Sequence, residues 1–424
     1  MSPALRILSP RCLLLLLAWQ FLGSTSAAVA SELATSAAES SDPLQIVVSL
    51  NEQSLTVFQG VTAIRQSRIS SGKPGHETPT GIFSILSKAK FHRSNIYSNA
   101  PMPWMQRLTW TGIALHESSS VPDYPASHGC VRMPKGFAEE LYSMTRRGAH
   151  VVITGAPQAP QPISSAVLPV PAARDYSPEM DHWRLAIEHG RRFATNPARF
   201  VSTSEMLKPV AGKLSLGNAS GKPLRVLITR RDRRQVTADV QFLLAKSGYD
   251  AGPVDGLFGR ATSAAVLQFQ KDRGLRTTGT ITPDFNKALW AEHGRSAPAT
   301  GHIYVRQDFQ PVFEAAISID DPETPLGTHL FTANNFDAAA GKTDWLAMTL
   351  ENQLPELTRA LFNIDSSAPH DVGAAEALAR IHIPEAVMKK LSQMLTDGSS
   401  ISISDTGLGP YTGWNTDFVV ATRI

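Results

Sequence analysis

Residues 124–134 of this chain read YPASHGCVRMP. The stretch places Cys130 directly after a histidine and a glycine, and Val131-Arg132-Met133 leads from it to Pro134. The chain contains two cysteines, and the other one, Cys12, lies in an N-terminal segment that we expect to be removed. An unpaired thiol in an oxidising compartment belongs to no disulfide framework and is a liability unless it reacts. Cys130 is therefore the first candidate for a functional residue.

The first thirty residues have the pattern of a secretory signal peptide. Arg6 and Arg11 precede an apolar run at 12–21, and small residues end the segment at Ala28-Val29-Ala30. The apolar run is too short to remain as a membrane-spanning helix. We expect cleavage after Ala30 and an exported, periplasmic mature protein. Residues 31–42 are rich in Ser, Ala, Thr and Glu and are expected to be disordered.

Length and charge limit the class of protein. The chain has 424 residues, which suggests two or three domains once the signal peptide is removed. With 40 Lys and Arg against 37 Asp and Glu, the formal net charge is +3, so the chain as a whole does not look like a nucleic-acid-binding protein. The arginines between 225 and 234 are interpreted as a solvated face.

Residues 43–155 have the pattern of a β-rich domain. Apolar residues alternate from Leu44 to Leu50, residues 51–53 form a turn, and the alternation resumes at Leu55, which predicts a β-hairpin. Further strands are expected over 82–86, 109–115 and 151–153, and an amphipathic helix between Pro134 and Gly148.

The rest of the chain divides by composition. Residues 156–174 are expected to be a Pro-rich linker, and residues 175–232 a connector of unclear fold, helical near 181–193 and strand-like at 224–229. Residues 233–292 show three short helical patterns separated by Gly-containing turns, which indicates a compact three-helix module.

Residues 300–424 contain a diverged repeat of the first domain. Pro384, Leu391, Met394, Gly398 and Ile403 follow Pro134, Leu141, Met144, Gly148 and Ile153 at a constant interval of 250 positions. Upstream, Pro325-Leu326-Gly327 and Phe331 match Pro79-Thr80-Gly81 and Phe83, and Ile303-Tyr304-Val305 matches Ile46-Val47-Val48. In this register Arg380 replaces Cys130 and Leu378 replaces His128, so the second copy is expected to lack the nucleophile.

The surroundings of Cys130 favour acyl transfer. A thiolate is the reactive form of cysteine, and a nearby imidazole, from His116 or His128, can accept the thiol proton. Gly129 allows backbone N–H groups to approach a developing oxyanion. His116-Glu117 begins like a zinc-protease motif, but Ser120 occupies the position of the second ligand, so no metal site and no cofactor are expected.

These residues carry a resemblance to a known family. Residues 43–155 resemble the catalytic domain of the L,D-transpeptidases, also called the YkuD domain, through Thr78-Pro79-Thr80-Gly81, His116 and Ser127-His128-Gly129-Cys130 with Val131-Arg132. Residues 233–292 resemble the three-helix peptidoglycan-binding module through Gly248-Tyr249, Asp255-Gly256, Phe258-Gly259, Thr262, Phe269-Gln270, Gly274-Leu275 and Thr278-Gly279. The implied architecture is multidomain and β-rich, with a YkuD-like β-sandwich, a small helical domain and a degenerate YkuD-like C-terminal domain.

The resemblance implies a function and a set of roles. Cys130 is expected to be the nucleophile and His116 the general base in forming 3→3 peptidoglycan cross-links. His128, Gly129, Arg132 and Ser127 are expected on the substrate and oxyanion side, with Ser127 bonding only within the loop. The acceptor remains open between a stem amine, water and the lysine of an outer-membrane protein. A non-catalytic peptidoglycan-binding scaffold is the alternative of another class.

Overall fold

The computed structural model describes residues 43–94, 99–172, 222–295, 298–352, 354–362, 364–365, 367–368, 371–409, 411–413 and 415–423. The expected signal peptide, the expected disordered segment at 31–42 and the expected helix near 181–193 lie outside these residues. Among the described helices, none is both long and apolar enough to cross a membrane.

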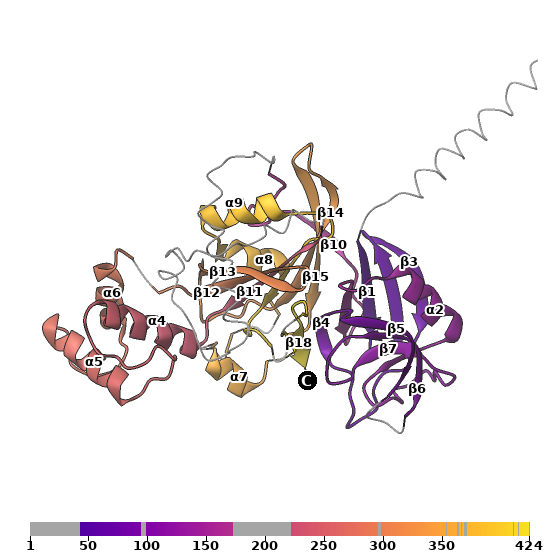
Figure 1. The fold of residues 1–424 in the computed structure, drawn as a ribbon, viewed down its shortest axis with the longest axis horizontal. Helices are drawn as coiled ribbons and strands as arrows, with labels where there is room; N and C mark the ends of the chain where they lie inside the picture. Colours follow the sequence, from indigo (N-terminus) through magenta and orange to yellow (C-terminus); the bar gives the residue numbers. More distant parts are fainter. Residues whose placement is uncertain are drawn as a thin grey trace, which may run out of the picture. The chain divides into compact units, whose positions relative to one another are not determined.

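The first sheet has six strands in the order β18-β4-β9-β1-β2-β3 (Figure 1). Their bounds are β1 (Leu44–Ser49), β2 (Ser54–Gln59), β3 (Thr62–Arg68), β4 (Thr80–Ser84), β9 (His150–Thr154) and β18 (Val420–Arg423). Strand β1 pairs antiparallel with β2, as the hairpin pattern predicts, and parallel with β9. Strand β1 is buried on both faces, because Ile46 and Val48 belong to one core and Val47 to another.

A smaller four-stranded sheet carries the sequence around Cys130. Its order is β5 (Ser87–Arg93), β6 (Pro101–Arg107), β7 (Ala114–Glu117) and β8 (Val131–Met133), and helix α2 (Lys135–Met144) follows β8. The prediction of a strand over 109–115 is wrong for most of that range. Thr109 Oγ1 accepts the N–H of Ile113 and Gly112 has φ +112°, so a turn occupies this segment and only its end enters β7.

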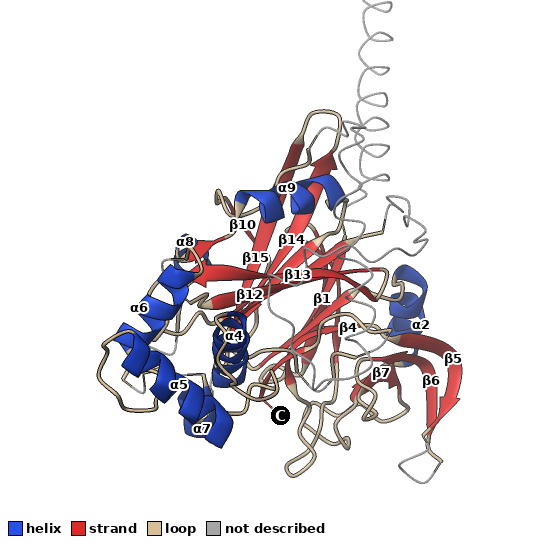
Figure 2. Cartoon of the chain, turned by 60° about the vertical axis from the view of Figure 1, so that its left-hand side comes forward, coloured by secondary structure: helices blue, strands red, loops and turns tan. Residues whose placement is uncertain are grey.

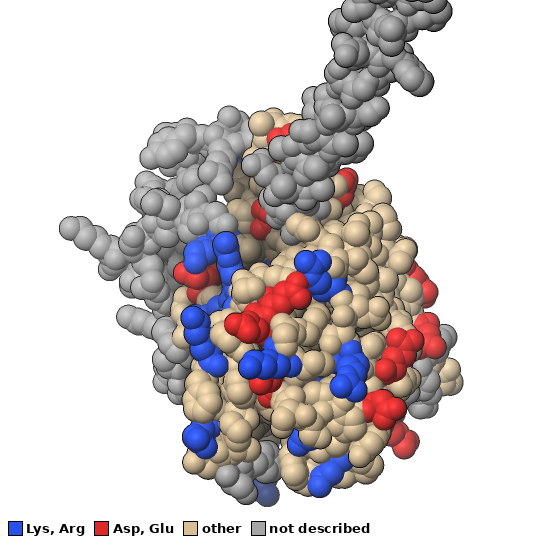
Figure 3. Space-filling view, turned by 90° about the vertical axis from the view of Figure 1, so that its right-hand side faces the viewer, with Lys and Arg blue, Asp and Glu red and all other residues tan. Residues whose placement is uncertain are grey.

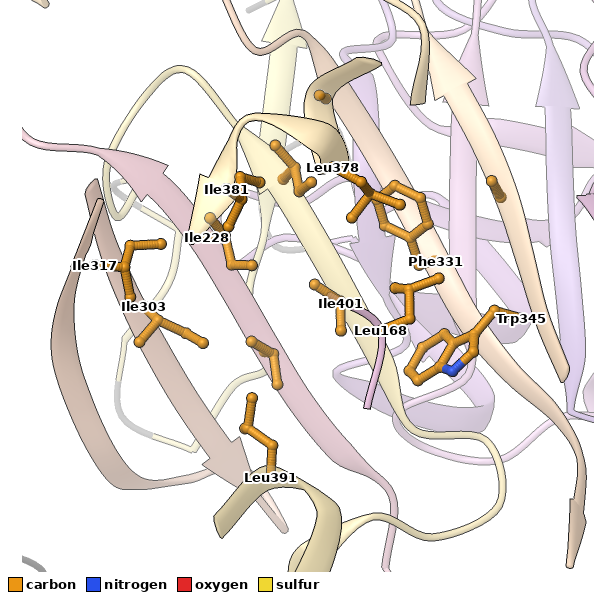
Figure 4. Packing of buried hydrophobic residues seen from close by; sticks show 14 of the residues in the cluster. Leu168, Ile228, Ile303, Ile317, Phe331, Trp345, Leu378, Ile381, Leu391 and Ile401 are labelled. Carbon is orange, nitrogen blue, oxygen red and sulfur yellow. The ribbon is translucent and has the colours of Figure 1, made fainter. Parts of the chain in front are cut away.

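The second large sheet has eight strands in the order β10-β15-β14-β17-β11-β12-β13-β16. Their bounds are β10 (Gln161–Ile163), β11 (Leu224–Arg230), β12 (Gly301–Gln307), β13 (Gln310–Ile319), β14 (Thr328–Asp337), β15 (Lys342–Leu350), β16 (Ile381–His382) and β17 (Ser400–Ser404). Helices α7 (Glu356–Leu361), α8 (Ala374–Ala379) and α9 (Glu385–Met394) complete this unit. Figure 4 shows its core, in which Phe331, Ile401 and Leu378 meet on one face of the sheet.

The two large sheets share one topology. Strands β14-β17-β11-β12-β13 repeat the order and directions of β4-β9-β1-β2-β3, including the parallel pair at the centre. Phe331 lies opposite Ile401, as Phe83 lies opposite Val151. We infer that the second unit is a duplicate of the first, as the repeated spacing in the sequence indicates.

The boundaries of this duplicate differ from those expected. It begins at β11, inside the segment expected to be a connector, and not near residue 300. Strand β11 occupies the place of β1, so Ile303-Tyr304-Val305 in β12 matches β2, and the expected match to Ile46-Val47-Val48 is wrong. Residue spacing alone did not distinguish two neighbouring apolar strands.

The three-helix module is an insertion in the β11–β12 hairpin (Figure 2). Helices α4 (Arg233–Lys246), α5 (Arg260–Asp272) and α6 (Pro283–Glu292) confirm the three helical patterns. Asp232 and Gln235 form a capping box at the start of α4, and Thr282 caps α6. Phe269, Phe285 and Trp290 fill the core of the module.

The segment expected to be a Pro-rich linker is packed against the second unit. Within it, β10 pairs with β15, Leu168 is buried, and the indole N–H of Trp345 donates to Pro169 O at 3.1 Å. Prolines lack an N–H but keep their carbonyl oxygens, so such a segment can still form an edge strand and accept hydrogen bonds. The described part of this segment is therefore an edge of the sheet.

The two sheets pack against each other through equivalent residues. Val47 and Ile82 of the first sheet share a core with Leu227 and Leu330, which hold the same strand positions in the second. Each unit also contributes a strand to the sheet of the other. Strand β10, which follows the first unit, pairs with β15 of the second sheet, and β18, which follows the second unit, pairs with β4 of the first. The units are therefore joined by main-chain hydrogen bonds as well as by side chains.

Candidate active site

Two adjacent parallel strands bring Cys130 and His116 together. Cys130 directly precedes β8, and β8 pairs with β7 so that Val131 lies opposite Leu115 and Arg132 opposite His116. Residues at the ends of neighbouring strands thus converge, although fourteen positions separate them in the sequence. The sequence predicted both residues, and the structure places both in the lining of one pocket.

A network of short hydrogen bonds shapes the loop before Cys130. Ser127 Oγ donates to Cys130 O at 2.5 Å and accepts the N–H of Gly129 at 3.1 Å. Thr78 Oγ1 donates to Gly129 O and accepts the N–H of Gly72, both at 2.8 Å. Gly129 has φ +105°, and a Cβ there would lie 2.8 Å from Ile113 Cδ1, so only glycine fits without strain.

The surroundings of Cys130 favour the protonated thiol. Its Sγ donates to Gly112 O at 3.3 Å. Burial raises the pKa of the thiol, and this effect outweighs a hydrogen bond from the backbone of Ala114 and the charges of Arg107 and Arg132, which lower it. Activation of the sulfur therefore requires a base that accepts its proton during the reaction.

His116 has the properties of that base. It is buried, and its Nδ1 donates to Glu117 O at 2.6 Å, which leaves Nε2 as the nitrogen with a free lone pair. Burial lowers the pKa of His116 to about 4, against the effect of the hydrogen bond to Glu117, and the charge of Arg132 lowers it further. The imidazole is neutral at neutral pH and can accept a proton.

The pocket around these residues has a volume of about 100 Å³. Its lining comprises His92, Ser94, Ala100, Pro101, Met102, Arg107, Gly112, Ala114, His116, Ser127, His128, Cys130 and Arg132. Five predicted site residues are therefore in the lining, and the sixth, Gly129, is buried. His128 is exposed and lies edge-on to His76; desolvation and the charges of Lys73, His76 and Arg132 lower its pKa.

Sequence reasoning missed three polar side chains of this pocket, Ser94 and the two larger ones, Arg107 and His92. Arg107 and His92 come from β6 and β5, more than twenty residues before Cys130, and neither belongs to a recognisable motif. The strands that carry them were not predicted, so no signal placed them near the thiol.

Comparison with known proteins assigns both recognisable domains. Residues 43–153 match the YkuD family, described as the L,D-transpeptidase catalytic domain, and residues 233–289 match a family described as a putative peptidoglycan binding domain. The chain thus contains a YkuD-type catalytic domain with a peptidoglycan-binding type of module inserted in its second β unit.

Individual relatives are similar over parts of the chain. An L,D-transpeptidase from Mycobacterium smegmatis is 23% identical, with a TM-score of 0.25, over 26% of this chain and 58% of that one. One from Stackebrandtia nassauensis is 26% identical, with a TM-score of 0.26, over 28% and 58%. A putative OxPP cycle protein OpcA from Synechocystis is 46% identical over 50 residues, which are 12% of this chain and 10% of that protein. The chain thus spans less than two thirds of these relatives, and the domain assignment rests on the two families.

Proposed function

We propose that this protein is a cysteine-dependent L,D-transpeptidase that forms 3→3 cross-links in peptidoglycan. The observation that carries the proposal is the position of His116 in the pocket of Cys130, with its Nδ1 held by Glu117 O and its Nε2 left to act as a base. The match of this domain to the L,D-transpeptidase catalytic family supports the reaction class.

The proposed reaction proceeds through a thioester. His116 Nε2 accepts the thiol proton while Cys130 Sγ attacks the carbonyl carbon of diaminopimelate in a tetrapeptide stem. The C–N bond to the terminal D-alanine breaks, and His116 returns the proton to the leaving amine. The side-chain amine of a second stem then attacks the thioester, gives its proton to His116, and the new amide releases the thiol.

The other predicted residues support this chemistry in different ways. Ser127 braces the loop through Cys130 O and the N–H of Gly129. For Gly129 to take its proposed part in binding the oxyanion, its N–H must give up the hydrogen bond to Ser127 Oγ and donate to the substrate oxygen instead. His128 lies at the exposed rim of the pocket, and Arg132 offers a guanidinium that can bind a substrate carboxylate through two hydrogen bonds.

The inserted module and the expected leader suggest where the enzyme works. A module of the peptidoglycan-binding type would hold the catalytic pocket near its polymeric substrate and raise the local concentration of stems. We propose an exported protein whose partner is peptidoglycan. Water or a lysine of an outer-membrane protein would use the same thioester with a different acceptor.

Mass spectrometry of reaction products tests this function. Purified residues 31–424 are incubated with disaccharide-tetrapeptide beside the variant Cys130→Ala. A dimer joined 3→3 in the wild-type reaction, absent with the variant, is the expected result. Tripeptide without dimer would reassign the enzyme as a carboxypeptidase or as one with a protein acceptor. With neither product, and no carbapenem adduct on Cys130 in the intact-mass spectrum, the scaffold alternative would replace the proposal.

A further inference from the structure

The pocket beside Cys130 carries positive charge that the proposed reaction leaves partly unassigned. The described residues that line it include the guanidinium groups of Arg107 and Arg132 and no Asp or Glu. On the outer face shown in Figure 3, by contrast, basic and acidic side chains are interspersed. The lining of the pocket is thus basic, and such a recess favours an anionic ligand.

Arg107 is positioned before any ligand binds. It ends β6, and its backbone is paired on both sides, with Ser87 of β5 and Ala114 of β7. Its Nη2 lies 3.4 Å from His92 Nε2, and its guanidinium carbon lies 5.9 Å from the centre of the Trp110 ring. A planar guanidinium held in this way loses little conformational freedom when it binds a carboxylate.

Arg107 also acts on the reacting atom. Arg107 and Cys130 line the same pocket, and Arg107 pairs with Ala114, the residue before Leu115, which lies opposite Val131. Burial raises the pKa of the Cys130 thiol, and the charge of Arg107 acts against this shift. A carboxylate bound by Arg107 would therefore lie beside Sγ, where the acyl donor must be placed.

We propose that Arg107, with His92 beside it, forms a carboxylate-binding subsite that positions the acyl donor at Cys130. The ligand class is a free carboxylate of a peptide, and the subsite gives the enzyme a preference for donors that carry one. This inference rests on the proposed function for the identity of the donor, but the subsite itself can be tested without turnover.

Alkylation of Cys130 by iodoacetate and by iodoacetamide provides the test. Both reagents bond to the same thiolate with loss of iodide, and they differ in presenting a carboxylate or a neutral amide. The ratio of their rates therefore cancels any change in the ionisation of the thiol. Rates are followed by intact mass on the full mature chain for wild type, Arg107→Gln, Arg107→Lys and Arg146→Gln. Arg146 is an exposed arginine after α2 and serves as the matched control for lost charge.

The ratio is the rate with iodoacetate divided by the rate with iodoacetamide. We expect it to be higher for wild type and for Arg146→Gln than for a cysteine-containing peptide. Loss of one charge-assisted hydrogen-bonding partner should lower the ratio about tenfold in Arg107→Gln, and less in Arg107→Lys, which keeps the charge. An unchanged ratio in Arg107→Gln, or a wild-type ratio at the peptide value, would overturn the subsite. If Arg107→Gln does not fold, the ratio for Arg107→Lys decides. If the protein showed no transpeptidation, the proposed function would fail, and the alkylation ratio would still decide by itself whether the subsite exists.

Discussion

The two β units place different side chains at the same position in one topology. Cys130 precedes β8 and faces an open pocket, whereas Arg380 precedes β16 and is turned into the protein. The short strand that follows is bridged in the same way in each unit, Ser70 to Arg132 in the first and Ser318 to His382 in the second.

The guanidinium of Arg380 is buried in the second unit and is hydrogen-bonded to its main chain. It donates to four backbone carbonyl oxygens of one loop, those of Asp320, Asp321, Thr324 and Pro325, at 2.7 to 3.2 Å. A thiol needs space and a base beside it, while a buried guanidinium needs acceptors around it. Under the proposed function, the same fold therefore serves catalysis in the first unit and holds a loop together in the second. The difference lies in which groups of the loop point inward.

Removing the strand that the second unit contributes to the first should have the largest effect. A chain that ends at Asp417 loses Phe418, Val419 and Val420, all buried, and leaves the edge of β4 unpaired. At about 1.5–3 kcal/mol for each buried side chain, the loss is about 5 kcal/mol, comparable to the whole stability of a domain. Urea unfolding should show a first unit that is largely unfolded, with Cys130 alkylated rapidly.

Leu408→Ala is the matched control for this truncation, because Leu408 is an exposed apolar residue of the same C-terminal segment. Its urea midpoint should stay at the wild-type value. If the truncated chain also kept that midpoint, the two units would be independent and the exchange of strands would contribute nothing.

Replacing Arg380 should have the next largest effect. In Arg380→Ala four carbonyl oxygens lose their donor, and since part of the loop can recover water, we expect a loss of about 3 kcal/mol. Arg380→Lys should recover part of it, because an ammonium group can still reach some of these acceptors. Thermal unfolding measures both, with Arg146→Ala as the exposed control. A melting temperature unchanged in Arg380→Ala would show that the loop does not depend on the guanidinium.

The smallest expected effect is the pH dependence of stability that arises from two buried histidines, His116 in the first unit and His329 in the second. Burial lowers the pKa of His116 and of His329 to about 4 in each case. Because the unfolded chain binds these protons near pH 6.5, their contribution is complete above that pH and is lost as the pH falls towards 4. Each should account for about 2 kcal/mol of the stability lost between pH 7 and pH 4.5.

The variants His116→Gln and His329→Gln test this comparison by urea unfolding at both pH values. Each should show a smaller acid-induced loss than wild type, but only His116→Gln should abolish cross-linking at pH 7. His329 keeps a structural role, with Nε2 donating to Leu326 O and Nδ1 accepting from Thr349 Oγ1. Equal loss of activity in both variants would contradict the separation of roles.

Local patterns in the sequence were sufficient for the parts of this protein that are built from near neighbours. The β1–β2 hairpin, helix α2 and the three helices of the inserted module follow from short apolar periods and turns. The candidate site follows from residue types: a lone thiol, a glycine that requires a positive φ, and a histidine on the preceding strand.

Only the tertiary structure decided which distant segments meet. The apolar residues of β1, β11 and β12 do not predict which strands these three pair with, because the alternation of side chains indicates burial and not the identity of the neighbouring strand. The placement of β18 beside β4, the burial of Arg380 and the entry of Arg107 into the pocket all depend on such long-range pairings. The sequence by itself therefore determined which reactive residues surround Cys130. Pairing of strands within the four-stranded sheet determined the walls of its pocket, and packing against the six-stranded sheet determined the support behind it.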